Sequence, residues 1–144
     1  MLKIKQPATI QEVFVYLWFI HTALLLSIFL YALIVFRLMP ATNHAPASKS
    51  LLTVLVAFSF YDIVMGRSLR SKKINLAFQK LRDIPNDQIS LDRWRQGQII
   101  GASLAECVAI YGVLIHFVGG SNLEVAVFFV AGAIVLLWWS PRKP

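Results

Sequence analysis

Four long apolar segments dominate the sequence, at residues 13–36, 51–66, 98–118 and 123–139. A helix of about 20 residues crosses a hydrocarbon core ~30 Å thick, and a backbone inside lipid must bond its polar groups internally. Apolar and polar residues do not alternate along these segments, as they would in a membrane β-barrel. We therefore predict an all-α membrane protein in which residues 1–144 form a single domain with four transmembrane helices.

Lysine and arginine are distributed unevenly between the connections. Two lie in the N-terminal tail, eight in the connection 67–97 and two in the C-terminal tail, so 12 of the 14 fall on one side of a four-helix arrangement. Connections on the cytoplasmic side carry such an excess. We expect both termini and the connection 67–97 on the cytoplasmic side of an inner or cytoplasmic membrane, with the turn-forming segment 39–48 outside. Anionic lipid headgroups, and not nucleic acid, are the expected partner of the net charge of +7.

The connection 67–97 fits two structures. Ile74, Ala77, Phe78 and Leu81 recur at helical spacing among basic residues, which is typical of an amphipathic helix lying in the headgroup layer. Alternatively, the second transmembrane helix continues into the cytoplasm as far as Leu81. The basic side chains that we expect at lipid headgroups are Arg67, Arg70, Lys72, Lys73, Lys80 and Arg82. Trp94, Trp138 and Trp139 are expected at the same boundary, where indole rings prefer to lie.

The third apolar segment carries a strip of small residues that would let another helix approach closely. Its members recur every fourth residue, with one more glycine beyond them: Gly97, Gly101, Ala105, Ala109 and Gly112. Glu106 flanks this strip. Counted from Gln98 at ~1.5 Å per residue, it lies roughly 12 Å into the membrane, where a carboxyl exchanges a proton only when water or a cation reaches it.

The residues around this carboxyl resemble a known family. The run IGASLAECVAIYGVLI at residues 100–115 is similar to the carboxylate-bearing helix of the ATP synthase c subunit, the rotor proteolipid. The resemblance covers residues 98–118 and does not extend to the rest of the chain. It implies that Glu106 occupies the position that carries a proton or sodium ion, with Tyr111 among the neighbouring motif positions.

Two histidines lie in apolar segments. His21 is expected at nearly the depth of Glu106, which suggests either an acid–histidine relay or a histidine bonded to a backbone carbonyl. His116 is too far along its helix to share one haem iron with His21, and whether it binds a pigment or haem of a partner stays open. The lone Cys107 cannot form an internal disulfide. No metal-ligand spacing or catalytic grouping is present, so we expect no cofactor and no enzyme.

Two functions remain on this sequence. The first is a small structural or assembly subunit of a larger membrane complex, which packs through the third helix against other subunits or a second copy. The alternative is a protein that handles protons or other ions, with Glu106 as the exchanging carboxyl and His21 and Tyr111 as further candidates. The first requires only packing, whereas the second requires a route for water or ions.

Overall fold

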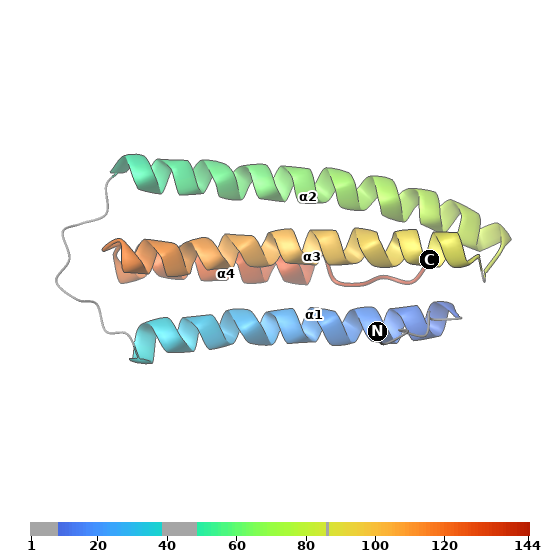
Figure 1. The fold of residues 1–144 in the computed structure, drawn as a ribbon, viewed down its shortest axis with the longest axis horizontal. Helices are drawn as coiled ribbons and strands as arrows, with labels where there is room; N and C mark the ends of the chain where they lie inside the picture. Colours follow the sequence, from blue (N-terminus) through green and yellow to red (C-terminus); the bar gives the residue numbers. More distant parts are fainter. Residues whose placement is uncertain (1–8, 39–48, 86) are drawn as a thin grey trace, which may run out of the picture.

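The computed structural model describes residues 9–38, 49–85 and 87–144. The described chain is helical, and three of its helices are long and apolar enough to cross a membrane. The fourth has 17 residues. The expected external loop 39–48 lies outside the described residues. The helices, drawn in Figure 1, are α1 at Ile10–Leu33, continued by the π-helical turn η1 at Ile34–Leu38, α2 at Lys49–Asp83, α3 at Gln88–Phe117, and α4 at Asn122–Trp138.

Side-chain caps fix where three of these helices begin. Thr9 caps α1 and Ser121 caps α4, each in a capping box with a glutamate three residues on. Asp87 caps α3 by accepting a hydrogen bond from the backbone N–H of Ser90 at 3.0 Å. Such caps satisfy backbone donors that the first helical turn leaves unpaired. Gly119 follows the C-cap residue Val118 of α3 and has a φ of 86°, a left-handed conformation that favours glycine after a helix end.

The third helix lies at the centre of the bundle. It packs against α2, α4 and α1. Among the described helices, the other extensive contacts of α1 are with α4 and with η1. Figure 1 shows α2 and α1 on opposite sides of the α3–α4 hairpin, with α4 alongside the half of α3 that is farther from the α2–α3 turn. The central helix therefore holds the other three together.

The basic connection 67–97 does not form a separate amphipathic helix, so that alternative is wrong. Helix α2 runs without a break from Lys49 to Asp83, and α3 already begins at Gln88. The apolar positions of this region, Ile74, Ala77 and Leu81, are buried against the first turns of α3, so they do not face lipid. Residues 67–97 thus form a helical hairpin that extends the bundle beyond the apolar half of α2.

Two clusters of buried side chains follow the bundle axis. The larger one joins α3 and α4 to Ile28 and Val35 on the α1 side and Leu55 of α2. The smaller one surrounds Trp94 in the basic half of the molecule. Trp94 is fully buried and stacks edge-on against Phe78 at 5.8 Å, so its predicted place at the lipid boundary is wrong.

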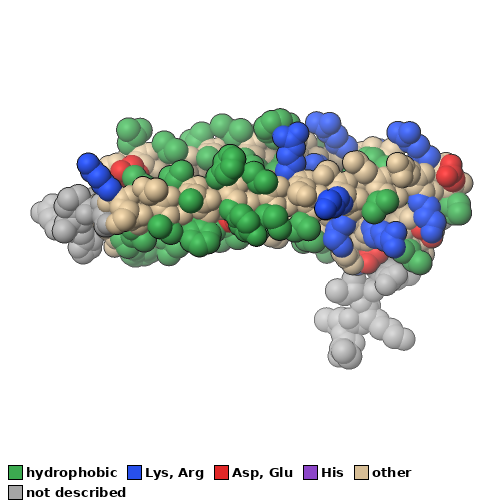
Figure 2. Space-filling model, turned by 90° about the horizontal axis from the view of Figure 1, so that it is seen from above, with side chains coloured by type: hydrophobic (Ala, Val, Ile, Leu, Met, Phe, Trp, Pro, Cys, Tyr) green, Lys and Arg blue, Asp and Glu red, His purple; other side chains and the backbone are tan. Residues whose placement is uncertain are grey.

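Basic side chains gather over the half of the molecule that contains the smaller cluster, and the other half is mainly apolar on the face seen in Figure 2. The C-terminal tail returns to this basic half: Pro141 is buried, and Lys143 Nζ donates to Gln11 Oε1 at 2.9 Å. The same ammonium lies 4.8 Å from the ring centroid of Phe14. The tail is thereby attached to the first turns of α1.

Candidate functional site

The carboxyl of Glu106 bonds α3 to α1. Ser27 Oγ lies 2.5 Å from Glu106 Oε1 and also 2.8 Å from the carbonyl oxygen of Leu24. A serine hydroxyl has one hydrogen, so the two acceptor oxygens share it. The Tyr31 hydroxyl lies within 3.5 Å of the same carboxyl oxygen.

A second carboxyl bonds α2 to α3. The Tyr111 hydroxyl donates to Asp62 Oδ2 at 2.7 Å. The ion pairs recorded in the described part of the chain, Lys80–Asp87 and Arg95–Asp92, do not involve Asp62. Tyr111, singled out by its motif position, therefore acts at the α2 side of α3 and not beside Glu106.

The two carboxyls flank the central helix. Glu106 and Tyr111 are five residues apart, which places them roughly 140° from each other around a helix with about 3.6 residues per turn. The side chain of Cys107 lies between them, close enough for both Asp62 and Glu106 to act on it electrostatically. All three side chains are half-buried. The middle of the bundle thus holds two carboxyls: Glu106 in the contact of α3 with α1, and Asp62 in the contact of α3 with α2.

The structure does not bring His21 to Glu106. His21 is buried, and it lines a small, partly open pocket together with Gln98 and Pro141. Gln98 precedes Glu106 by eight residues, or ~12 Å along α3. The prediction that His21 and Glu106 lie at nearly the same depth is wrong, because α3 starts ten residues before Gln98 and packs on α1 in another register. Within the described residues His21 Nε2 has no hydrogen-bond partner, and its ring contacts Trp18 edge-on at 5.8 Å.

His116 lies in the last turn of α3, at the opposite end from His21. Its Nδ1 is buried and has no hydrogen-bond partner in the described part of the chain. Its ring contacts that of Phe117 edge-on at 6.0 Å. A search of the described residues found no group of three or more His, Cys, Asp or Glu side chains able to hold a metal ion.

The small-residue strip of α3 is filled by helices of this chain. A Cβ added at Gly97 would lie 3.1 Å from Ile74 of α2, and one added at Gly112 would lie 3.1 Å from the carbonyl oxygen of Val125 in α4. Between these two, Ala105 and Ala109 face Gly132 of α4, where an added Cβ would lie 3.0 Å from the backbone nitrogen of Ala109. A partner protein would consequently contact another part of the surface.

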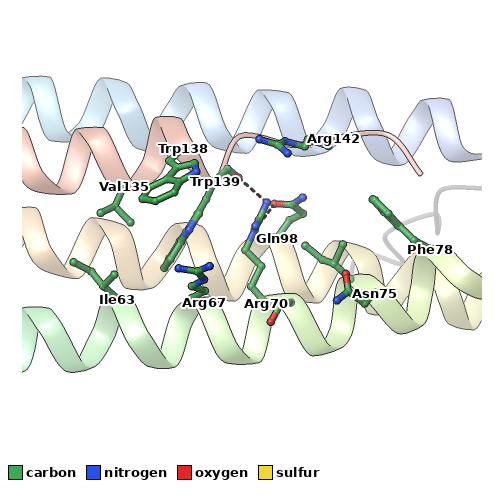
Figure 3. A pocket seen from close by; sticks show the side chains of 12 residues that line it. Ile63, Arg67, Arg70, Asn75, Phe78, Gln98, Val135, Trp138, Trp139 and Arg142 are labelled. Carbon is green, nitrogen blue, oxygen red and sulfur yellow. Dashed lines mark hydrogen bonds between the residues drawn. The ribbon is translucent and has the colours of Figure 1, made fainter.

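Arg70 joins three helices near the middle of α2. Its Nε donates to Gln98 Oε1 at 3.3 Å, and its Nη2 donates to the carbonyl oxygen of Trp139 at 3.3 Å (Figure 3). The carbonyl lies at the C-terminal end of α4, where a cation offsets the helix dipole. The indole of Trp139 packs on Gly66, where an added Cβ would lie 2.8 Å from the ring. Sequence reasoning assigned Arg70 to headgroups and did not find these bonds.

The other predicted headgroup residues differ in their surroundings. Lys73 Nζ donates to Gln96 Oε1 at 3.1 Å, and Lys80 Nζ lies 3.7 Å from Asp87 Oδ2. Arg67, Lys72 and Arg82 are exposed. Arg67 lines a cavity with Arg70 and Arg142, the last of which was not among the predicted headgroup contacts.

Comparison with known protein families, with characterised proteins and with solved structures found no match.

Proposed function

We propose that the chain crosses the membrane four times, with both termini on the cytoplasmic side. Helix α4 has 17 residues, or ~26 Å at ~1.5 Å per residue, close to the ~30 Å of a hydrocarbon core. The basic residues of α2, of the first turns of α3 and of the C-terminal tail gather in one half of the molecule, as the positive-inside bias predicts for a cytoplasmic end.

We further propose that the protein is a small structural or assembly subunit of a larger membrane complex. The observation that carries this is a shallow apolar hollow of about 320 Å³ on the outer face of α2, lined by Val54, Ala57, Phe58 and Tyr61. Small residues let helices approach in lipid, where packing drives association. Ala57 is the small residue of this face, and the half-exposed rings of Phe58 and Tyr61 border it. A transmembrane helix of a partner would fit this hollow.

The proposed interface is tested by filling the hollow. Ala57→Phe should convert an assembly extracted in mild detergent into the free 16.2 kDa chain. Ala23→Phe is the matched control, because Ala23 is also exposed but lies on α1. Native mass measurement and crosslinking report the size of the assembly. If the parent protein is a single free chain in its native membrane, the subunit function is wrong. If the two variants change the size of the assembly equally, the interface does not lie on α2.

A second function, the handling of protons or other ions, is favoured by one observation. The Glu106 and Asp62 carboxyls lie in the apolar half of the molecule, and within the described chain they accept hydrogen bonds from the hydroxyl groups of Ser27, Tyr31 and Tyr111. Ionisable groups inside membranes are costly and often mark proton or ion pathways. Glu106 also occupies the ion-carrying position that the c-subunit resemblance implies.

Flux measurements in liposomes separate this second function from the first. Glu106→Gln keeps the shape and hydrogen bonding of the side chain but cannot titrate, so it should abolish proton or ion flux at unchanged stability. Asp62→Asn makes the matching change to the other carboxyl, which lies on the α2 side of α3. Dicyclohexylcarbodiimide, which reacts with neutral carboxyls in apolar surroundings, should label Glu106 in the parent. If the parent protein shows no flux, the ion-handling function is wrong and Glu106 serves the packing of α1 on α3.

A further inference from the structure

A cavity of about 370 Å³ opens between α2 and the end of α4, with Gln98 of α3 at its inner wall (Figure 3). Three arginines line it: Arg67 and Arg70 from α2, and Arg142 from the tail after α4. No acidic side chain is among the described residues that line it. Three cations that share one partly enclosed space repel one another, and a bound anion would offset this repulsion.

The hydrogen-bonding groups of the cavity are mostly donors. Arg70 is held in place by its bonds to Gln98 and to the Trp139 carbonyl, which leaves its other N–H groups available. Gln98 is 4% exposed, and within the described chain its Nε2 has no hydrogen-bond partner. An oxygen-rich anion would accept from these groups, and planar guanidinium groups match the geometry of phosphate oxygens.

The cavity lies where α2 changes from apolar to basic. Ile63 and Val135 line its end toward the apolar half, whereas Asn75 lines its end toward the basic half. The ring of Trp138 lies at its rim and is 67% exposed. A ligand that fits this arrangement has a phosphate in the polar part and a hydrocarbon chain that leaves along Ile63 and Val135.

We propose that this cavity binds the phosphate headgroup of an anionic phospholipid, held by Arg67, Arg70 and Arg142. The proposal differs from general attraction of a basic surface to anionic lipid, because it assigns one bound lipid to one enclosed position. It does not depend on whether the chain is a subunit or handles ions.

The test measures lipid binding to the full chain in mild detergent by native mass spectrometry, with phosphatidylglycerol as the anionic probe and phosphatidylcholine as the zwitterionic one. The double variant Arg67→Gln/Arg142→Gln should weaken binding of one phosphatidylglycerol by about tenfold, as expected when charge-assisted hydrogen bonds are lost. The matched control Lys72→Gln/Arg82→Gln removes the same charge from exposed positions of α2 outside the cavity and should bind as the parent does.

Three results would overturn the proposal: equal weakening by the two double variants, equal binding of phosphatidylcholine, and no saturable binding by the parent. Glycerol 1-phosphate, which lacks acyl chains, tests the other source of phosphate. If it occupies the site with the affinity of the lipid, the ligand is a soluble phosphate and the lipid assignment is wrong. If the double variant does not fold, Arg142→Gln alone serves as the test, because Arg142 lies outside the helices.

Discussion

Ser27 Oγ lies 2.5 Å from Glu106 Oε1 and 2.8 Å from the carbonyl oxygen of its own helix at Leu24. Helix α1 is thereby tied to the central helix through a hydrogen bond from Ser27 to the Glu106 carboxyl. A double-mutant cycle of Ser27→Ala and Glu106→Leu should give a coupling free energy of about 0.6 kcal/mol, the average for hydrogen bonds between transmembrane helices. Reversible unfolding in detergent measures it.

Two controls accompany this cycle. Glu106→Gln can still donate to Ser27, so it should keep most of the stability that Glu106→Leu loses. Ser103→Ala changes an exposed serine of the same helix and should leave stability unchanged. If the two single changes combine additively, the Ser27–Glu106 contact contributes no stability.

Two glycine contacts along α3 predict unequal effects of adding one methyl group. At Gly132 a new Cβ would lie 3.0 Å from the backbone nitrogen of Ala109, which cannot move without separating α3 from α4. At Gly101 it would lie 2.8 Å from Cδ of Arg70, and a shift of this side chain disturbs its bonds to Gln98 and Trp139 but leaves the helix backbones in place. Gly132→Ala should therefore destabilise the bundle by about 1–3 kcal/mol, and Gly101→Ala by clearly less. Thermal melting in detergent ranks them, and the reverse order would contradict this packing.

Asp87 predicts how stability changes at acid pH. The hydroxyl and backbone N–H of Ser90 donate to its carboxylate, and Lys80 lies nearby, so the pKa of Asp87 is below its ordinary value despite some desolvation. A lowered native pKa means that the ionised form stabilises the fold. The contribution is present above the ordinary pKa of about 3.9 and is lost as pH falls through the lower native value.

Melting temperatures between pH 7 and pH 3 measure this contribution. Asp87→Asn preserves a good cap but does not titrate, so the variant should lose less stability than the parent over this range. Asp87→Ala removes the cap and should be less stable at every pH. Parallel pH profiles of the parent and Asp87→Asn would show that the carboxylate does not contribute.

The distribution of charge predicts the orientation of the chain. Reporter fusions after Pro144 and within the segment 39–48 should give opposite signals, with the C-terminal reporter on the cytoplasmic side. A fusion after residue 120, between α3 and α4, should match the reporter in the segment 39–48. A C-terminal reporter outside the cytoplasm would contradict four crossings or the proposed orientation.

The helices themselves could be read from the sequence, because each contains a long apolar segment. The extent of α2 could not, because residues 67–83 are equally amphipathic whether they face lipid headgroups or another helix. Burial of Ile74 and Leu81 against α3 shows that this segment faces another helix. The spacing of its apolar residues is the same in both cases and cannot distinguish them. Pro85 and the cap at Asp87 were the available signals that one long hairpin is formed.

The candidate site could be predicted only as single residues. Glu106, Asp62 and Tyr111 are conspicuous because polar groups are rare in apolar helices, but their partners depend on how far each helix is shifted along its neighbour. Ser27 gave no signal of its own, since serine is common in transmembrane helices. His21 was placed beside Glu106 by counting from the wrong helix start, and a shift of about two turns separates the two.

The central position of α3 also sets the order in which the molecule can assemble. Helices α1 and α2 are synthesised first, yet each has its main packing partner in residues 88–117. Both must therefore be synthesised before either can dock on its main partner. The segment after α4, whose Lys143 contacts Gln11 and Phe14, is synthesised later still and attaches to the beginning of α1. Translation proceeds from one end of the chain to the other, whereas the packing of both earlier helices has to wait for the third.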